Sequence, residues 1–591
     1  MPKTYTKRKI LFLSIMMLIS FALLLTRLSY LMIAKSEYYL TKAENLHQRQ
    51  RSIKAKRGVI YDRNGVELAG NKPVCSISVI HSQVRDEETV VKALCDVLGM
   101  NEEEIRKKVE ANTIREKIKS NVDKETADVL RDMKLAGVMI DEDYKRYYPY
   151  DELASKVLGF TGSDNQGIVG LEVSYDEVLS GKAGSILTLT DANGVEIKNE
   201  AESRIEPIAG NDLHISIDVN IQKYAEQAAK KVQKAKDAKR VSVVLMNPQN
   251  GEIYAMVNVP EYNLNEPYKL VGKSDKNLNE KELGDALNNM WRNFCINDTY
   301  EPGSTFKTVT ATAALEEKVV NVNDTFSCPG FRVVEDRRIK CHKKAGHGTE
   351  TFKQGIMNSC NPVFIDVGAR VGVDKMYKNY EKLGLFEKTG VDLPGEAGSI
   401  MHKKENVGAV ELATMSFGQS FQITPLQLLR AVSAIINGGK LVTPHFAMYA
   451  TNENGEVVKN YSYTEKEKVI KKSTSKTMKE LLEAVVAEGS GAKGRVVGYR
   501  VGGKTATSEK LPRGTGKYIS SFLGFAPANN PQIIGLIMID EPTGIYYGGT
   551  IAAPVMSEIF ENILPYMGMK ADYKQEELKA AMSTIYVEEG D

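Results

Sequence analysis

The stretch Pro302-Gly-Ser304-Thr-Phe-Lys307 runs without a break into Thr308-Val-Thr-Ala-Thr-Ala-Ala-Leu-Glu316. The second part has apolar residues at helical spacing, so it predicts a helix with Ser304 at or near its first turn. Residues three apart lie on one face of a helix, so the amine of Lys307 can reach the hydroxyl of Ser304. The free N–H groups and the dipole at a helix start also favour a developing negative charge.

This pair of residues predicts nucleophilic chemistry. A serine hydroxyl is a weak nucleophile, but a lysine that is desolvated in a cleft can lose its proton near neutral pH and act as a base. Ser304 is therefore a candidate nucleophile and Lys307 its candidate general base. Because Ser and Lys are common, a bare Ser-x-x-Lys arises by chance about once or twice in a chain of this length.

Two further elements give the pair its weight. Ser359-Cys-Asn361 follows the predicted helix, and Lys504-Thr-Ala-Thr507 closes a predicted strand near the C-terminus. Their order and separation match the three-part site S-x-x-K, S-x-N and K-T-G of penicillin-binding proteins and class A β-lactamases.

The N-terminus predicts a membrane anchor. Basic residues at positions 3, 7, 8 and 9 precede an uncharged stretch over residues 10–26, and apolar residues continue to Ile33. Residues 10–33 therefore predict one spanning helix, with residues 1–9 in the cytoplasm and the rest of the chain extracytoplasmic. A cleaved signal peptide is the alternative, although no small-x-small cleavage site follows the apolar stretch.

Length and composition indicate a multidomain protein without a nucleic-acid partner. A chain of 591 residues exceeds what one hydrophobic core usually supports, and its net charge of +2 gives no electrostatic case for a polyanion. The composition changes near residue 210. We expect a pedestal over residues 34–210 with a helical lobe at about 86–134, a second domain over 211–568 and a tail over 569–591.

Turn and strand signals outline the fold. Arg57–Gly65 predicts a hairpin with an Asn64-Gly65 turn, and residues 242–259 predict two strands around an Asn250-Gly251 turn. Residues 495–507, 518–526 and 532–540 predict three more strands. Strands at both ends with helical sequence between them predict an antiparallel sheet covered by helices.

Several independent segments carry a family resemblance: Arg57–Gly65, Gly167–Glu172, Arg292-Asn293, Glu301–Ser304, Gly418-Gln419, Thr424–Gln427 and Ser521–Pro527. With them, the chain resembles the class B penicillin-binding proteins, the monofunctional D,D-transpeptidases of division, elongation and sporulation. The resemblance extends from the anchor to about Pro565. It implies an α/β multidomain fold with one N-terminal transmembrane helix, an elongated mixed pedestal and a transpeptidase domain.

The resemblance also implies a reaction and its partners. Ser304 would be acylated by a peptidoglycan stem peptide, which loses its last D-alanine and is then joined to an amine of a neighbouring stem. β-Lactam antibiotics would acylate the same serine. A polymerising glycosyltransferase would be the membrane partner, and catalysis would need no cofactor.

Residue roles follow from the same resemblance. Lys307 would activate Ser304, Ser359 would relay a proton to the leaving amine, and Asn361 would hold the substrate amide. Lys504 would supply positive charge. Three residues of the strand are expected to bind substrate, with Thr505 and Thr507 at the terminal carboxylate: Thr505, Ala506 and Thr507. The backbone N–H groups of Ser304 and Thr507 would form the oxyanion hole.

Ala506 departs from the family pattern, which has glycine at this position. A methyl group where substrate or drug approaches predicts altered drug sensitivity rather than inactivity. A tolerated substitution with little effect is the alternative. Ala506 and the large pedestal motivate an alternative function, a catalytically silent scaffold for wall synthesis. A D,D-carboxypeptidase or a β-lactamase is the second alternative, although neither explains the pedestal.

Cysteines and histidines beside the predicted nucleophile have zinc-like spacing. The ligand candidates are Cys328, Cys341, His342 and His347, in the pattern C-x12-C-H-x4-H. Asp324 or Asp336 could replace one histidine. A structural zinc site, a Cys328–Cys341 disulfide and unlinked thiols all remain open. Cys360, inside the Ser-x-Asn element, is not expected to be catalytic.

Overall fold

The computed structural model describes residues 4–36, 48–111, 115–189, 203–272 and 278–571. The chain forms two compact units and enters each of them more than once. Unit one comprises Met1–Lys56, Lys72–Lys145 and Gly181–Ala209, and unit two comprises Arg57–Asn71, Arg146–Ser180 and Gly210–Asp591. The predicted domain boundaries, which divide the chain into consecutive pieces, stay predictions.

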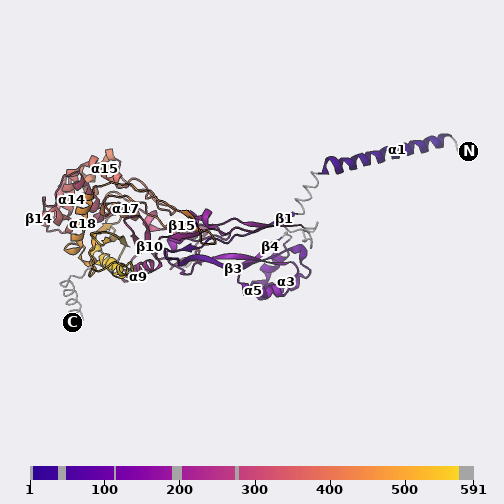
Figure 1. Cartoon of the computed structure of the whole chain (residues 1–591), viewed down its shortest axis with the longest axis horizontal. Coiled ribbons are helices and arrows are strands. Elements are labelled where there is room, and N and C mark those ends of the chain that lie inside the picture. The colour runs from indigo at the N-terminus through magenta and orange to yellow at the C-terminus, as the bar shows by residue number, and fades with distance from the viewer. Residues whose placement is uncertain (1–3, 37–47, 112–114, 190–202, 273–277, 572–591) are drawn as a thin grey trace. The chain divides into compact units, whose positions relative to one another are not determined.

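The N-terminal apolar stretch is helical. Helix α1 (Thr4–Ser29) continues into the π-helical turn η1 (Tyr30–Ala34), as Figure 1 shows in indigo. The segment Arg8–Ile33 is long and apolar enough to cross a membrane, and none of its apolar window is buried. This helix suggests a membrane anchor.

Unit one contains a three-stranded sheet and some strands of a seven-stranded one. The three-stranded sheet has the order β1–β6–β7, formed by Gln48–Ile53, Gly184–Leu189 and Ser203–Ile205. The other pairs the later part of β3 (Glu67–Val79) with β4 (Glu116–Val122) and β5 (Val138–Tyr147). A 3-10 turn, η2 (His81–Gln83), follows β3.

A helical cluster completes unit one, formed by α3 (Glu87–Leu98), α4 (Glu102–Val109) and α5 (Lys124–Asp132). Helix α3 begins where the Asp86 carboxylate accepts a hydrogen bond from the Thr89 N–H, and it ends at Gly99, which has a φ of 63°. Strand β4 interrupts the helical lobe expected over residues 86–134. Its buried side chains, Ile118 and Val122, belong to a pattern closer to period two than to helical spacing, and it pairs with β3.

The hairpin predicted at Arg57–Gly65 is confirmed in unit two. Strand β2 (Ile60–Tyr61) pairs antiparallel with the start of β3. The Asp62 carboxylate accepts hydrogen bonds from the N–H groups of Asn64 and Val66, both at 2.8 Å. The same sheet continues from β2 through β8 (Asp212–Ile215), β15 (Ala447–Thr451) and β16 (Val457–Asn460).

A buried ion network lies among the short helices α6 (Ser155–Leu158), α7 (Gly170–Ser174) and α8 (Asp176–Leu179). The Glu172 carboxylate accepts hydrogen bonds from Arg57 Nε at 2.7 Å and from Arg146 Nε at 2.6 Å. Arg57 Nη1 also donates to Asp176 at 2.7 Å. Each buried guanidinium therefore has a carboxylate partner.

A five-stranded antiparallel sheet is the centre of unit two and confirms the predicted fold class. Its order is β10–β9–β19–β18–β17, formed by Ile253–Val259, Arg240–Met246, Ile533–Asp540, Tyr518–Ala526 and Gly502–Glu509. The strand predicted over residues 495–507 is wrong at its start, because Gly498 has a φ of 79° and turns the chain before β17 begins at Gly502.

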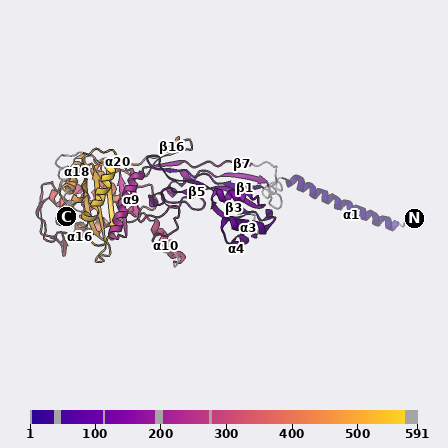
Figure 2. The ribbon, with the colours of Figure 1, turned by 90° about the horizontal axis from the view of Figure 1, so that it is seen from below.

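Helices cover both faces of this sheet. On one face α9 (Val219–Lys236) and α20 (Ala553–Tyr566) form a core with strand residues such as Val243 and Ile537. Figure 2 shows these two helices side by side. Val244 belongs to a separate core on the other face, because neighbouring strand residues point to opposite sides.

The second core includes residues of several helices from the middle of the chain. The other helices described in unit two are α10 (Glu280–Trp291), α11 (Phe294–Asn297), α12 (Lys307–Glu316), α13 (Phe352–Met357), α14 (Asn361–Val371), α15 (Val373–Lys382), α16 (Ala409–Met415), α17 (Pro425–Ile436), α18 (Lys472–Ala487) and α19 (Gly548–Ile551), with the 3-10 turns η3 (Gly303–Phe306), η4 (Lys404–Asn406) and η5 (Ala492–Gly494). Two small hairpin-like pairs precede α13: β11 (Thr325–Cys328) with β14 (Gly348–Thr351), and β12 (Phe331–Val334) with β13 (Arg337–Lys340).

Candidate active site

Ser304 lies half-buried in the 3-10 turn η3, directly before α12. Two glycines let this turn pack closely. A Cβ added to Gly303, which has a φ of 56°, would lie 2.3 Å from Ser508 Oγ on β17. A Cβ added to Gly418 would lie 2.0 Å from the Gly303 carbonyl oxygen. The turn that carries Ser304 is therefore held against the edge strand β17.

The amine of Lys307 is fully buried and binds only neutral acceptors among the described residues. Its Nζ donates to the Ser359 carbonyl oxygen at 2.7 Å, to Ser359 Oγ at 3.3 Å and to Asn361 Oδ1 at 2.7 Å. The structure thus brings together the first two of the three predicted motifs.

Burial lowers the pKa of Lys307 to about 8, because the ammonium ion loses its hydration. The nearby Cys360, Cys341 and Glu350 offset part of this effect. At pH 7 about a tenth of this amine is therefore unprotonated, which is the state that a general base needs.

Ser359 and Asn361 are positioned by the break between α13 and α14. Ser359 has a φ of 54°, so this non-glycine residue adopts the left-handed conformation that turns its carbonyl oxygen toward Lys307. Asn361 begins α14 and donates from Nδ2 to the carbonyl oxygen of Lys340 at 3.1 Å. That bond links the site to the end of β13.

Strand β17 contributes the third motif from the edge of the sheet. Its register pairs Lys504 with Leu523 and Thr507 with Ser520 on β18, and its other edge carries no strand among the described residues. Lys504 is fully buried. Burial, together with repulsion from Lys307, lowers the pKa of Lys504 well below its usual value.

The side chains of the strand point to two sides. Ala506 is buried, and its Cβ would lie 3.5 Å from a Cβ built on Gly303, so its methyl group faces the turn that carries Ser304. Thr507 Oγ1 accepts a hydrogen bond from the Gly548 N–H at 3.0 Å, and Thr505 Oγ1 lies 3.4 Å from Ser490 Oγ. The expectation that this methyl group alters drug sensitivity stays a prediction.

A cluster of sulfur and nitrogen ligands lies beside Asn361. One ligand atom from each member lies within 4.8 Å of every other, and the members are Cys328, Cys341, His347 and Cys360. Three of the four agree with the predicted set, whereas the structure places Cys360 in the group where the sequence suggested His342. The His342 Nδ1 lies 3.8 Å from Cys341 Sγ and outside this group. All six cysteines are free, so the structure contains no Cys328–Cys341 disulfide.

The sequence reasoning missed two features of the site. Cys360 joins the cluster because it sits in the middle of the Ser-x-Asn element, and that position was the only available signal. The second is an ion pair: Arg513, in the loop after β17, binds Glu301 at 2.8 Å, three residues before Ser304. Nothing in the spacing of Glu301 and Arg513 indicated this contact.

Known proteins resemble this chain over nearly all of its length. A family model described as Penicillin binding protein transpeptidase domain matches residues 241–561, and one described as Penicillin-binding Protein dimerisation domain matches residues 52–215. Stage V sporulation protein D of Bacillus subtilis is 38% identical over 582 residues, which cover 97% of this chain and 88% of that protein. Peptidoglycan D,D-transpeptidase FtsI of Escherichia coli is 29% identical, with 94% of this chain and 91% of that protein covered.

The fold is also known. The crystal structure of penicillin binding protein 2X from Streptococcus thermophilus superimposes with a TM-score of 0.72 at 22% identity, covering 89% of this chain and 83% of that one. The predicted family and fold class are therefore confirmed. The chain belongs to the penicillin-binding proteins and combines their dimerisation domain with their transpeptidase domain.

Proposed function

We propose that this chain is a membrane-anchored serine D,D-transpeptidase that cross-links peptidoglycan stem peptides in division or sporulation. The observation that carries the proposal is the buried Lys307 amine, which has a pKa of about 8 and lies one helical turn from Ser304. The name of one relative, a peptidoglycan D,D-transpeptidase, supports this reaction, and the name of another, a stage V sporulation protein, supports a role in sporulation.

In the acylation step, neutral Lys307 takes the proton of Ser304 Oγ as that oxygen attacks the carbonyl carbon of the penultimate D-alanine. The negative charge that develops on the carbonyl oxygen is stabilised by the N–H groups of Ser304 and Thr507. The carbon–nitrogen bond then breaks, and Ser359 relays a proton to the leaving amine of the last D-alanine. The hydrogen bonds from Lys307 to both oxygens of Ser359 support this relay.

In the second step, an amine of a neighbouring stem attacks the ester of Ser304, and the serine oxygen recovers its proton. Asn361 holds the substrate amide. It also helps to place Lys307, because its Oδ1 accepts a hydrogen bond from the Lys307 amine at 2.7 Å. Lys504 adds positive charge when the substrate carboxylate lies near it, because an adjacent anion opposes the effect of burial on its pKa. Thr505 and Thr507 with Ala506 form the strand beside which the substrate lies. β-Lactams acylate Ser304 in the same way.

Labelling with a fluorescent penicillin tests the proposal. The full-length protein is expected to take up one label, and Ser304→Ala is expected to take up none while it unfolds at an unchanged temperature. Absence of label on the natural protein would favour a silent scaffold, and equal labelling of Ser304→Ala would disprove the role of Ser304. With lipid-linked substrate, hydrolysis without cross-links would favour a D,D-carboxypeptidase.

The cluster of Cys328, Cys341, His347 and Cys360 fits a structural zinc ion. Three thiolates and one imidazole are a common set for such an ion, and in a tetrahedral site these atoms would be about 3.5 Å apart. The observed spread, within 4.8 Å, needs only a small contraction. The buried Glu350 Oε1 lies 3.8 Å from His347 Nδ1, the ring nitrogen that also faces the sulfur atoms of Cys328 and Cys341, so this carboxylate lies against the cluster. The ion would brace the loop that ends at Asn361.

Elemental analysis of protein purified without added zinc tests this site. About one zinc per chain is expected, and Cys360→Ser is expected to lower the zinc content while His342→Ala is not. A mass lower by two protons without bound metal would instead indicate a Cys328–Cys341 disulfide.

The proposal also includes the orientation of the chain in the membrane and a partner enzyme. The basic residues before the apolar helix support a cytoplasmic N-terminus and an extracytoplasmic catalytic domain over residues 211–568. Without a polymerising domain of its own among the matched regions, the enzyme would act with a membrane glycosyltransferase. Protease protection of intact cells, compared with lysed cells, reports the orientation.

A further inference from the structure

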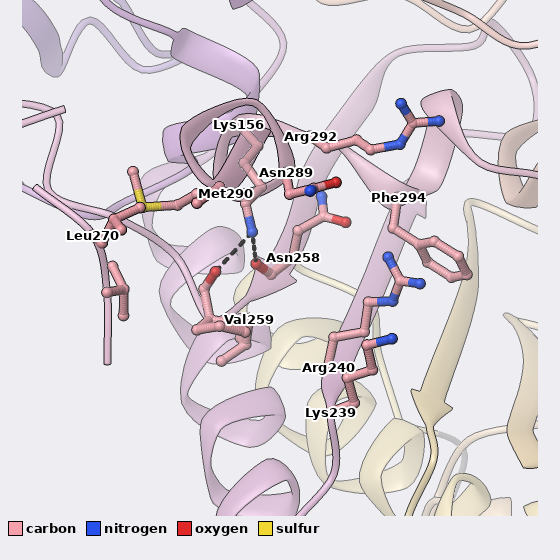
Figure 3. A pocket seen from close by; sticks show the side chains of 13 residues that line it. Lys156, Lys239, Arg240, Asn258, Val259, Leu270, Asn289, Met290, Arg292 and Phe294 are labelled. Carbon is pink, nitrogen blue, oxygen red and sulfur yellow. Dashed lines mark hydrogen bonds between the residues drawn. The ribbon is translucent and has the colours of Figure 1, made fainter. Parts of the chain in front are cut away.

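A basic pocket lies in unit two, and none of its lining residues belongs to the candidate active site. Its volume is about 330 Å³, and it lies between the ends of β9 and β10 and helix α10. Four cationic side chains and no carboxylate line it (Figure 3): Lys156, Lys239, Arg240 and Arg292. A lining of this kind favours a negatively charged ligand.

The Lys156 amine is held at one wall with donor capacity to spare. Its Nζ donates to the carbonyl oxygens of Asn258 and Pro260, both at 2.7 Å, as the dashed lines in Figure 3 indicate. An ammonium group has three N–H donors, so one remains for a ligand. Burial lowers the pKa of Lys156, and the nearby Glu261 opposes part of this shift.

The two arginines of the pocket share their carboxylates. Asp298 binds Arg292 Nε at 2.9 Å and lies 3.5 Å from Arg240 Nη1. The Asp540 carboxylate binds Arg240 Nε at 2.8 Å and also forms an ion pair with Lys510 Nζ at 2.7 Å. Neither carboxylate is therefore available to one arginine alone.

The positive charge of Lys239 is compensated even less by carboxylates. Its amine lies 3.5 Å from the Glu541 carboxylate. That carboxylate also binds Lys510 at 2.6 Å and Lys517 at 3.0 Å. The cations around the pocket thus outnumber the carboxylates that they contact. Lys239 and Arg292 are 59% and 47% exposed, so this excess positive charge can attract an anion from solvent.

The rest of the lining suits a ligand with an apolar body. Val259, Leu270, Met290 and Phe294 form part of the wall, and the Phe294 ring lies 3.9 Å from the guanidinium carbon of Arg240. The volume falls in the range of small-molecule sites. We propose that this pocket is a second ligand site, which binds a small carboxylate- or phosphate-bearing molecule with an apolar or peptide body.

The chain provides its own reporter for this site. Trp291 is the single tryptophan of the sequence and stands between Met290 and Arg292, which both line the pocket. Full-length protein in detergent is titrated with L-alanyl-γ-D-glutamate, a peptide with two carboxylates, and separately with geranyl phosphate. A saturable change in tryptophan fluorescence is expected with at least one probe, and the tighter one identifies the anionic group.

Variants distinguish the pocket from general charge attraction. Lys239→Gln and Arg292→Gln are each expected to weaken binding at least about fivefold. Lys231→Gln, which removes an exposed cation outside the pocket, is expected to bind as the natural protein does. Calorimetry checks that Arg292→Gln has not merely altered the neighbouring tryptophan.

Two results would overturn the site: no saturable binding of either probe, or equal weakening by Lys231→Gln. Ser304→Ala protein is expected to bind both probes unchanged, and penicillin labelling of Lys239→Gln is expected to be unchanged. The pocket and the transpeptidase reaction can therefore fail independently of each other.

Discussion

Among the described residues of unit two, Arg57 in the ion network and Lys307 beside Ser304 are both completely buried cations, yet their surroundings are opposite. Arg57 meets two carboxylates, on Glu172 and Asp176, each at 2.7 Å. Among the described residues, the Lys307 amine donates hydrogen bonds only to oxygens of Ser359 and Asn361.

The difference shows in the pKa values. Burial acts to lower the pKa of both groups, but Glu172 and Asp176 outweigh it at Arg57, whose pKa is raised. At Lys307 burial dominates and lowers the pKa to about 8. A buried cation with carboxylate partners is a fixed structural charge, whereas one without them can exchange its proton. Four predictions test this contrast.

The largest effect is expected from Lys307→Met. Loss of the base should slow acylation by a fluorescent penicillin about 10³-fold, because proton transfer from Ser304 is lost. Removing the buried amine relieves its desolvation cost but leaves the oxygens of Ser359 and Asn361 without this donor, so the free energy of unfolding should change by less than about 1 kcal/mol. Labelling kinetics and urea unfolding measure the two quantities, and a variant that unfolds easily would contradict the contrast.

Glu172→Gln should reduce stability but not acylation, which is the opposite of Lys307→Met. It leaves two buried guanidiniums short of negative charge and should lower the free energy of unfolding by about 3–5 kcal/mol. Penicillin acylation by the protein that remains folded should be nearly unchanged. Asp176→Asn is the matched control: its carboxylate is partly exposed, so a loss below about 1 kcal/mol is expected. Equal losses in urea unfolding would show that burial of the carboxylate is unimportant.

The pH dependence of acylation should follow Lys307. The amine acts as base only when unprotonated, so the rate should rise about tenfold per pH unit below its pKa and level off above about 8. Labelling rates between pH 6 and 9.5, within a range where the protein stays folded, measure this profile. A rate that is flat between pH 6 and 8 would mean that Lys307 is already unprotonated or is not the base.

The smallest effect is expected from Ala506→Gly. The buried methyl faces the Ser304 turn, so its removal should lower the free energy of unfolding by about 1 kcal/mol. Acylation rates for small and bulky β-lactams should change by less than about threefold. A large increase in the acylation rate for bulky β-lactams alone would support the prediction that this methyl group obstructs them.

Local sequence was sufficient for much of the fold. The Asn64-Gly65 turn, the strands around residues 242–259 and the helix after Ser304 all depend on contacts between near neighbours. The start of β17 and the strand β4 were not predicted correctly. Both depend on pairing with distant strands, to which residue propensity contributes little.

The sequence by itself determined the three motifs, the apolar N-terminal helix and the presence of Cys and His beside the cleft. Only the tertiary structure decided that Lys307 has no carboxylate partner among the described residues and that Cys360, rather than His342, joins the ligand cluster. The physical reason is that burial and partner geometry arise where α12, α13, α14 and the β11–β14 segment meet. Residue spacing along the chain indicates which groups are available, but a pKa or a ligand set depends on which groups packing leaves within a few ångströms.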